Sequence, residues 1–462
     1  MLAGGSERWE QRLPSGLSAL VYRDYRLIWI GQIISNVGSS MQQLGLGWLI
    51  VELAQADNRP DLVPFYLGLV GLARGVPTLF AGLTAGVVAD RVDRRKLLMG
   101  VQIYWAIISA VLAWLVLIDK INIGLVLALT VLSSVAQAFD GATRATLYPR
   151  LVPPRAMVSA IGLNSMSFNV AQFIGPLIGG LLIGPIGVGG LVTLNALSFL
   201  ALIWAIAISS PLAANLKSKS PASPLRSLHE SFAFVVRQPI VGWAMLLSLV
   251  GNIFARSFQQ LLPAFVAVVL VGDAQDLSFM MTAAGVGALT GAFATASLGG
   301  LRRRGLVYVA SGIVMGGMLV VFGLQESLIP ALILVFLVAC CSQLFITMAS
   351  TLFNTHAPDD LRGRIMGLST VVVQGGISIG ALVIGALGAL IGVGAALSTG
   401  GAVVALTNAA VLWRVKPLRN DTSRDEDAAD ARAAQLARPV VAVRPVRMAR
   451  QPLDPEQTPA GR

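Results

Sequence analysis

The sequence predicts an all-α polytopic membrane protein whose twelve transmembrane helices form two six-helix halves. Mean hydropathy is +0.75, and only 12% of the 462 residues are charged, about half the share of an average soluble protein. Apolar residues form stretches of about 20, the length at which a helix crosses a bilayer, rather than the alternating strands of an outer-membrane barrel. The third observation, after composition and the length of the apolar stretches, is an internal repeat, which predicts the two halves. A soluble globular fold is therefore excluded.

Twelve stretches are long and apolar enough to span a membrane, and they leave little of the chain over. An even number of spans places both termini on the same side. The stretches cover residues 27–53, 65–89, 97–117, 122–148, 159–185, 189–209, 240–268, 277–300, 305–323, 330–352, 365–390 and 394–413.

The connections between these stretches differ in charge. The even-numbered connections along the chain contain fifteen lysines and arginines, whereas the odd-numbered connections contain only Arg59 and Lys120. Because basic connections stay on the cytoplasmic side, this asymmetry predicts that both termini are cytoplasmic. We therefore expect a multi-pass protein of a bacterial inner (cell) membrane.

The internal repeat aligns residues 146–163 with residues 351–368, without a gap and with a shift of 205. The matching positions include proline and glycine in polar stretches, which shared apolar composition does not explain. They are Thr146/Thr351, Leu147/Leu352, Pro153/Pro358, Gly162/Gly367 and Leu163/Leu368. Parallel repetition of two six-span halves is typical of transporters that bind substrate between the halves, near the membrane midplane.

The repeat and the spans predict the domain organisation. An N-terminal cytoplasmic segment, 1–26, precedes the halves 27–209 and 240–413, which a cytoplasmic central loop, 210–239, connects. Apolar residues at helical spacing predict that part of this loop lies along the inner membrane surface: Leu225, Leu228, Phe232, Val235 and Val236. Residues 414–462 are rich in Asp, Arg, Ala and Pro, and they predict a disordered cytoplasmic tail.

The strongest local motif joins the second and third spans. It contains Gly86, Asp90, Arg91, Arg94 and Arg95. A turn this short brings two helices together, and its charges can hold one packing of the halves and release another. The motif resembles the Gly-x-x-x-Asp-Arg-x-Gly-Arg-Arg loop of the major facilitator superfamily. Asp93 stands where that pattern usually has glycine, which puts the tight-turn role of this position in doubt.

A second charged pair stands near the cytoplasmic end of the fourth span. Asp140 and Arg144 are four residues apart and share one helix face, so they can form an ion pair. We expect them to complete the gating cluster around Asp90 and Arg91.

The fifth span carries small residues at regular spacing around a proline. They are Gly162, Gly175, Pro176, Gly179 and Gly180. Small residues permit close helix packing and the proline removes a backbone hydrogen bond, so this helix can act as a hinge or a seal. The spacing is similar to the antiporter motif of the same superfamily, with Ala171 at its second glycine. That resemblance is what implies export.

The resemblance extends over about residues 20–415, with its clearest stretches at 22–53, 71–98 and 139–153. These are similar to the enterobactin-exporter and macrolide-efflux branch, the transmembrane secretion effectors. The resemblance implies the superfamily fold, but no motif specifies the substrate.

Polar side chains within the spans are costly unless they face protein or water, and they are therefore candidates for the substrate cavity. Arg74 and Arg256 lie near the midplane of the second and seventh spans, without an obvious acid nearby, which favours an anionic substrate. Amides at comparable depth complete the candidates: Gln42, Gln43, Gln259 and Gln260.

Proton coupling has fewer candidates. Asp140 is the best embedded carboxylate, and Glu52, at the outer end of the first span, is a weaker one. No acid is predicted at the midplane, so the sequence offers no carboxylate there to couple protons to the cargo.

Other functional classes lack the residues they need. We find no P-loop, no paired nucleophile and histidine and no metal-ligand cluster, so we expect no enzyme activity, no catalytic residue, no cofactor and no metal. The net charge of +11 belongs to membrane topology rather than to nucleic-acid binding. The sequence therefore predicts an exporter of siderophore- or drug-like small molecules, driven by an ion gradient and surrounded by membrane lipids, which we expect to be a monomer. The alternatives are a lysolipid or lipid flippase and a non-transporting scaffold or receptor with the same fold.

Overall fold

The computed structural model describes residues 15–148, 151–209, 234–297, 303–358, 361–415 and 418. Within these ranges, the side chains at 83, 86, 87, 89–91, 145, 146 and 296 are not described. Most of the central loop and of the predicted C-terminal tail therefore lies outside the described residues, as do Leu225, Leu228 and Phe232.

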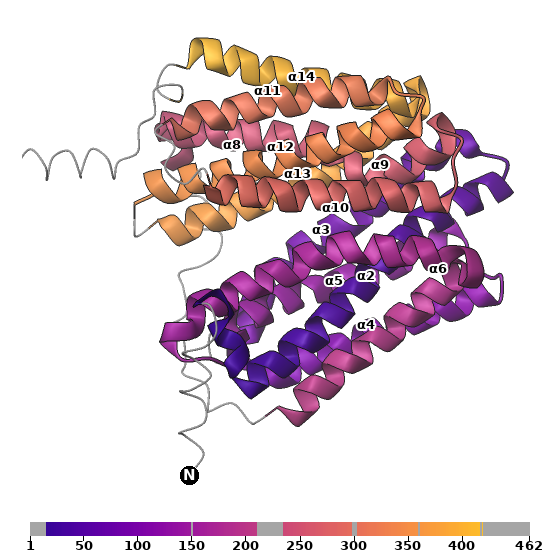
Figure 1. The fold of residues 1–462 in the computed structure, drawn as a ribbon, viewed down its shortest axis with the longest axis vertical. Helices are drawn as coiled ribbons and strands as arrows, with labels where there is room; N and C mark the ends of the chain where they lie inside the picture. The colour runs from indigo at the N-terminus through magenta and orange to yellow at the C-terminus, as the bar shows by residue number, and fades with distance from the viewer. Residues whose placement is uncertain are drawn as a thin grey trace, which may run out of the picture. The chain divides into compact units, whose positions relative to one another are not determined.

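The described chain is built of helices (Figure 1). The N-terminal group consists of η1 (Ser15–Val21), α2 (Arg23–Ala56), η2 (Pro60–Leu62), α3 (Val63–Arg91), α4 (Arg94–Leu117), α5 (Ile123–Leu147), η4 (Pro154–Ala156) and α6 (Met157–Ile208). The C-terminal group consists of α8 (Pro239–Gly251), η5 (Asn252–Arg256), α9 (Phe258–Ala264), η6 (Phe265–Val269), α10 (Ala274–Ser297), α11 (Arg304–Gly323), α12 (Leu328–His356), α13 (Arg362–Ile391) and α14 (Val393–Arg414).

Ten helical segments among the described residues are long and apolar enough to cross a membrane. One of them, Pro154–Ile208, holds two predicted spans, because α6 breaks at Gly187, whose φ of 65° suits glycine. The 34-residue α2 is not among the ten, since its two adjacent glutamines and several serines lower its hydropathy. The twelve predicted spans thus correspond to helical segments of the structure.

The seventh span is not a regular α-helix. Two π-helical segments, η5 and η6, interrupt it on either side of α9. The hydropathy pattern did not predict these segments, because a π turn adds a residue without changing how apolar the stretch is.

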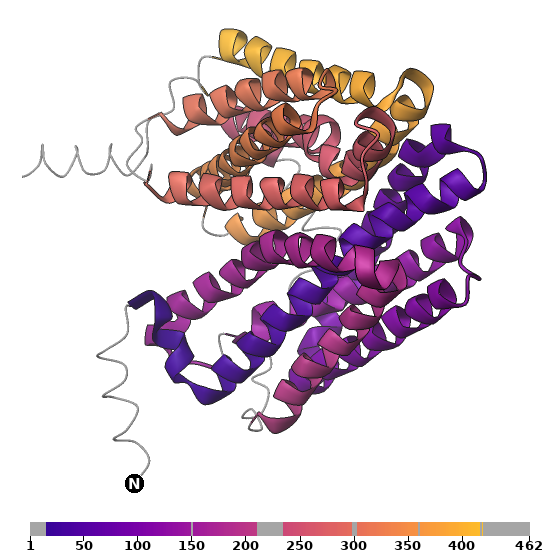
Figure 2. The same cartoon turned by 45° about the vertical axis from the view of Figure 1, so that its right-hand side comes forward.

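The two groups repeat the same packing pattern. In the N-terminal group α3 packs on α5, and α4 packs on α5 and α6; in the C-terminal group α10 packs on α12, and α11 packs on α12 and α14. The repeat-related helices α5 and α12 begin at Ile123 and Leu328, 205 residues apart, as do α6 and α13 at Met157 and Arg362. Figures 1 and 2 show the indigo-to-magenta helices packed together and the pink-to-yellow helices packed together. The repeat seen in the sequence is therefore a repeat of the fold.

Because successive helices run in opposite directions, alternate connections lie at the same end of the bundle. We call the end with residues 92–93, 148, 151–156, 303, 357–358 and 361 the basic end. The opposite end carries residues 57–62, 118–122, 270–273, 324–327 and 392.

The groups meet mainly where α3 packs on α13 and α6 packs on α10. A Cβ added at Gly68 of α3 would lie 2.7 Å from the carbonyl oxygen of Ala381 of α13, and a Cβ at Gly385 would meet the carbonyl oxygen of Pro64. On the other seam, a Cβ at Gly285 would lie 2.8 Å from the carbonyl oxygen of Gln172. The α3–α13 contacts lie in the half of each helix nearer the opposite end, so the groups are closely packed there, and the α6–α10 contact lies near the middle of both helical segments.

Candidate functional site

A cavity of about 390 Å³, lined by both polar and apolar side chains, lies mainly within the N-terminal group. Helices α2 to α6 supply most of its lining, while α9 and α10 contribute from the C-terminal group. Along α2 the lining runs from Ser35 to Gly47, about 18 Å at the rise of an α-helix. Five of the six predicted substrate candidates lie in this lining: Arg74, Gln42, Gln43, Gln259 and Gln260.

Arg74 supplies a positive charge to the cavity wall. It lies on α3 and is half-buried, and among the described residues its guanidinium has no hydrogen bond or ion pair. The other charged lining residues, Asp140 and Arg144, neutralise each other. The described lining therefore carries a net charge of about +1, which favours an anion or a strong hydrogen-bond acceptor.

Gln42 is held by its neighbours rather than directed wholly into the cavity. Its side-chain oxygen accepts hydrogen bonds from Ser109 Oγ at 3.0 Å and from Asn195 Nδ2 at 2.6 Å. These contacts tie α2 to α4 and to the second part of α6. Gln43, its neighbour, also lines the cavity, and its side chain has no hydrogen bond among the described residues. Of this pair, Gln43 is the better placed to bind a ligand.

The three candidates in the seventh span do not all line the cavity. Gln259 and Gln260 lie on α9 and line the cavity, and no side-chain hydrogen bond is found for either within the described part of the chain. Arg256 is not among the lining residues; its Nη1 donates to Asn252 Oδ1 at 3.2 Å. Arg256 belongs to the π segment η5, whose extra residue changes the helical register that the sequence prediction assumed.

Asp140 and Arg144 form the expected ion pair at one end of the cavity. Arg144 Nε lies 2.7 Å from both carboxylate oxygens of Asp140, and both residues are buried. Gln102 of α4 adds a hydrogen bond from its Nε2 to Asp140 Oδ1 at 3.0 Å. The pairing prediction is confirmed, and Asp140 is a fully engaged acceptor.

The ion pair continues into a chain of hydrogen bonds. Arg144 Nη1 donates to the hydroxyl of Tyr148 at 3.2 Å, and that hydroxyl donates to the side-chain oxygen of Gln32 on α2. Gln32 Nε2 in turn donates to Asn164 Oδ1 of α6 at 3.0 Å. This chain joins α5, α2 and α6, so a change at the ion pair can reach three helices.

The loop motif has a clear structural role at its second half. Asp93 has φ −58° and ψ 116°, a conformation open to any residue, and its side chain accepts hydrogen bonds from the backbone N–H groups of Arg95 and Lys96. Asp93 thus caps α4, which explains why glycine is not needed. Arg95 donates to the carbonyl oxygens of Ile206 and Ala207, at the end of α6, at 3.0 and 2.9 Å. Arg94 is buried.

The other residues of that motif lie outside the described side chains. Gly86, Asp90 and Arg91 belong to the backbone of α3, but their side chains are not described. Their predicted link to Asp140 and Arg144 stays a prediction.

The fifth-span motif lies on α6, which stays helical through Pro176. A Cβ at Gly175 would lie 2.9 Å from the carbonyl oxygen of Val37, so this glycine lets α2 approach closely. Gly179 also faces α2, and Gly180 faces Ser278 of α10 in the other group. Gly162 has no atom within 4 Å of an added Cβ. The motif therefore serves helix packing at three of its four glycines.

The sequence prediction missed several cavity residues. Trp105 and Phe199 pack at 5.8 Å between ring centroids and both line the cavity. Four further lining residues are amides within the predicted spans. Because an amide is costly in a bilayer, its presence in an apolar stretch was the signal that could have identified them. They are Asn36, Gln137, Gln172 and Asn195. Glu52 is exposed near the end of α2 and is not in the lining.

Comparison with known proteins adds independent findings. The family described as transmembrane secretion effector matches residues 14–446. An enterobactin exporter of Shigella boydii serotype 4 is 26% identical over 373 residues, covering 79% of this chain and 85% of that protein. An enterobactin exporter of Escherichia coli O81 is 27% identical over 375 residues, with the same coverage.

Solved structures share the fold. A D-xylose–proton symporter superposes with a TM-score of 0.67 at 12% identity, covering 87% of this chain and 99% of that one. A bacterial homologue of the human lysosomal transporter Spinster, inward-facing and occupied, has a TM-score of 0.65 at 13% identity, covering 84% and 96%. These likenesses show the major facilitator fold.

Proposed function

Because the chain belongs to the transmembrane secretion effector family of major facilitator transporters, we propose that it exports a small anionic molecule across the bacterial inner membrane. The observation that carries this proposal is Arg74, a guanidinium on the cavity wall with no acid partner among the described residues. An anion bound there gains charge-assisted hydrogen bonds, which are about twice as strong as neutral ones.

The cavity also bears on the size and type of cargo. Its volume of about 390 Å³ falls in the range typical of small-molecule sites. Aromatic and aliphatic lining residues stand beside the amides and Arg74, which suits a drug-like or siderophore-like compound with an apolar body. The enterobactin exporters among the relatives support a siderophore-like cargo.

Alternating access is supported by the uneven contact between the two groups. The close glycine contacts of α3 with α13 lie toward the opposite end, whereas Gly82 of α3 and Gly367 of α13, nearer the basic end, have nothing within 4 Å of an added Cβ. On α5 the cavity lining reaches Arg144, close to the basic end. If the basic end is cytoplasmic, as the loop charges predict, this arrangement is the state that receives cargo from the cytoplasm. Both termini then lie in the cytoplasm as well.

For coupling we propose proton antiport, with Asp140 as the proton-binding group and Glu52 as a weaker candidate. Protonation of Asp140 would break its pairing with Arg144 and disturb the hydrogen bonds that run to Tyr148 and Gln32. The same step would change the gating cluster that we expect around Asp90 and Arg91.

The test is flux into inside-out vesicles that contain the reconstituted protein. Siderophores, macrolides and lysolipids are offered with and without a pH gradient. Export is supported when an anionic compound accumulates and collapse of the gradient stops it. Lysolipid movement alone would favour the flippase, and no flux of any compound would favour a scaffold or receptor.

A further inference from the structure

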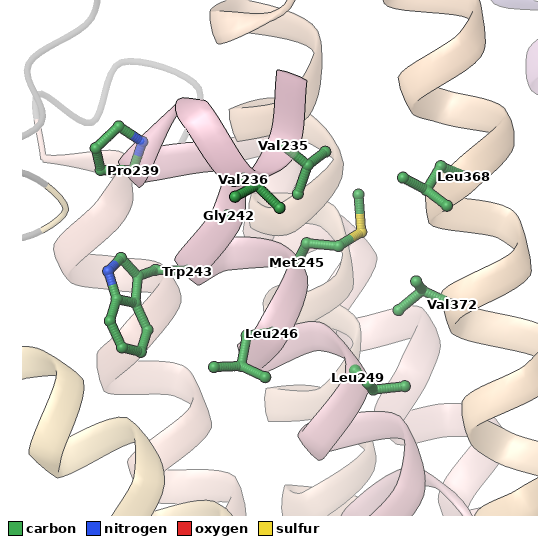
Figure 3. Close-up of a pocket in the computed structure, with 10 residues that line it drawn as sticks. All are labelled: Val235, Val236, Pro239, Gly242, Trp243, Met245, Leu246, Leu249, Leu368 and Val372. Carbon is green, nitrogen blue, oxygen red and sulfur yellow. The ribbon is translucent and has the colours of Figure 1, made fainter. Parts of the chain in front are cut away.

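A second cavity, of about 490 Å³, lies between α8 and α13 and is apolar throughout its lining. Figure 3 shows two side chains of α13 extending toward side chains of α8 across this space. The residues that face each other there are Leu368 and Val372 of α13 and Met245 and Leu249 of α8.

The cavity opens at the surface of the protein, where its exposed lining is apolar. Three of its lining residues are strongly exposed for apolar side chains: Val236 (68%), Leu246 (43%) and Trp243 (39%). In a membrane-spanning protein the medium around such residues is hydrocarbon. A lipid acyl chain can therefore enter this cavity without crossing a polar barrier.

Basic residues stand at one end of the cavity. Arg237 directly follows the lining residue Val236 and is exposed. On α13, Arg364 precedes Leu368 by four residues and Val372 by eight, so the three share one helix face. Arg364 is then about 6 Å along the axis from Leu368, toward the basic end. Arg237 thus stands beside the apolar lining in sequence, and Arg364, which already has a partner within the protein, stands one helical turn beyond it.

We propose that this cavity is a binding site for one anionic phospholipid. An acyl chain occupies the apolar space, and the phosphate group lies at the exposed Arg237, which follows the lining residue Val236. Basic pockets between transmembrane helices on the cytoplasmic side bind anionic lipid headgroups, and long basic side chains near helix ends reach the interface. The site is separate from the transport cavity and does not depend on the proposed cargo.

Other classes of ligand would use either the apolar lining or Arg237, but not both. An uncharged apolar compound would gain nothing from Arg237, and a soluble anion would gain nothing from the apolar lining. Only an amphiphile with a negative head and a hydrocarbon tail uses both. A phospholipid of the surrounding leaflet has this chemistry and is present at high local concentration.

The test measures lipid retained by the purified full-length protein, using native mass spectrometry in detergent. Phosphatidylglycerol and phosphatidylcholine with identical acyl chains are titrated in parallel. We expect one phosphatidylglycerol to bind more tightly than phosphatidylcholine. Arg237→Gln should weaken phosphatidylglycerol about fivefold, the effect of one arginine near a membrane surface, and leave phosphatidylcholine unchanged. Leu368→Trp, which places a larger side chain in the apolar space, should weaken both lipids.

Matched controls come from α14. Arg414 is an exposed arginine at the basic end, and Leu406 is an exposed leucine away from the cavity. Arg414→Gln and Leu406→Trp should leave retention unchanged. Equal retention of the two lipids, or equal effects of Arg237→Gln and Arg414→Gln, would overturn the proposal. If Leu368→Trp fails to fold, Arg237→Gln decides alone, because that side chain is exposed.

Discussion

At the scale of single residues, the charged side chains of the cavity differ in whether they have a counter-charge. Asp140 and Arg144 hold each other at 2.7 Å and leave no net charge, whereas Arg74 has no such partner among the described residues. An ion pair buried in this way contributes little to stability while it is intact, but one buried charge left alone is costly.

That cost gives a first prediction. Asp140→Asn leaves the buried Arg144 without its counter-charge and should destabilise the protein by about 3–5 kcal/mol, whereas the double variant Asp140→Asn/Arg144→Met should lose much less. Reversible unfolding in mixed micelles measures both values. Equal losses in the single and double variants would contradict the description of Asp140 and Arg144 as a coupled pair.

The sequence identified some of these residues and not others. Arg74 and Gln43 were found because a polar group in an apolar stretch stands out. The hydrogen bonds from Gln102 to Asp140 and from Tyr148 to Gln32 were not found, because they join three helices whose facing sides the sequence does not define. Which arginine faces the cavity also depended on a π segment that hydropathy does not reveal.

At the scale of elements, glycines set how closely the two groups approach. Gly68 of α3 has no room for a Cβ beside Ala381, whereas Gly82 of the same helix has nothing within 4 Å. The first contact crosses between the groups, so we expect it to break when the opposite end opens. A methyl group there should act on the conformational equilibrium more than on the folding of either group.

The second prediction follows from this difference. Gly68→Ala should favour the state that is open at the opposite end by about 5- to 150-fold, the equivalent of the roughly 1–3 kcal/mol that overpacking costs. The cavity-lining Leu67, replaced by cysteine in a background without Cys340 and Cys341, should then react faster with a membrane-impermeant thiol reagent applied at that end.

Gly82→Ala is the matched control on the same helix and should leave the labelling rate unchanged. If both glycine variants label alike, the α3–α13 contact does not control access at this end.

The span limits were predictable from sequence to within a few residues, including the break between residues 185 and 189, where the structure has Gly187. Length and hydropathy suffice for this, since the bilayer imposes both. The pairing of α3 with α13 was not predictable, because helices in lipid associate through small residues that are common along the whole chain.

At the scale of the whole molecule, orientation in the membrane decides the direction in which the cavity opens. The third prediction concerns orientation. Single cysteines at 93, 218, 303 and 360 should react only from the cytoplasm, and those at 58 and 274 only from outside, because the basic connections stay inside. Reaction at 303 from the periplasm would reverse the assignment and, with it, the direction in which the cavity opens.

The central claim is that a single cavity arginine selects an anionic cargo. The most direct test compares transport of an anionic compound and its neutral analogue by the native protein, Arg74→Gln and Arg256→Gln, the last because Arg256 lies outside the cavity lining. A charge-assisted hydrogen bond contributes about 1.5–3 kcal/mol, so Arg74→Gln should weaken the anion about 10- to 150-fold and change the neutral analogue little. Arg256→Gln should leave transport of both the anion and its neutral analogue unchanged. Equal losses for anion and neutral analogue in Arg74→Gln, or no loss at all, would contradict the account.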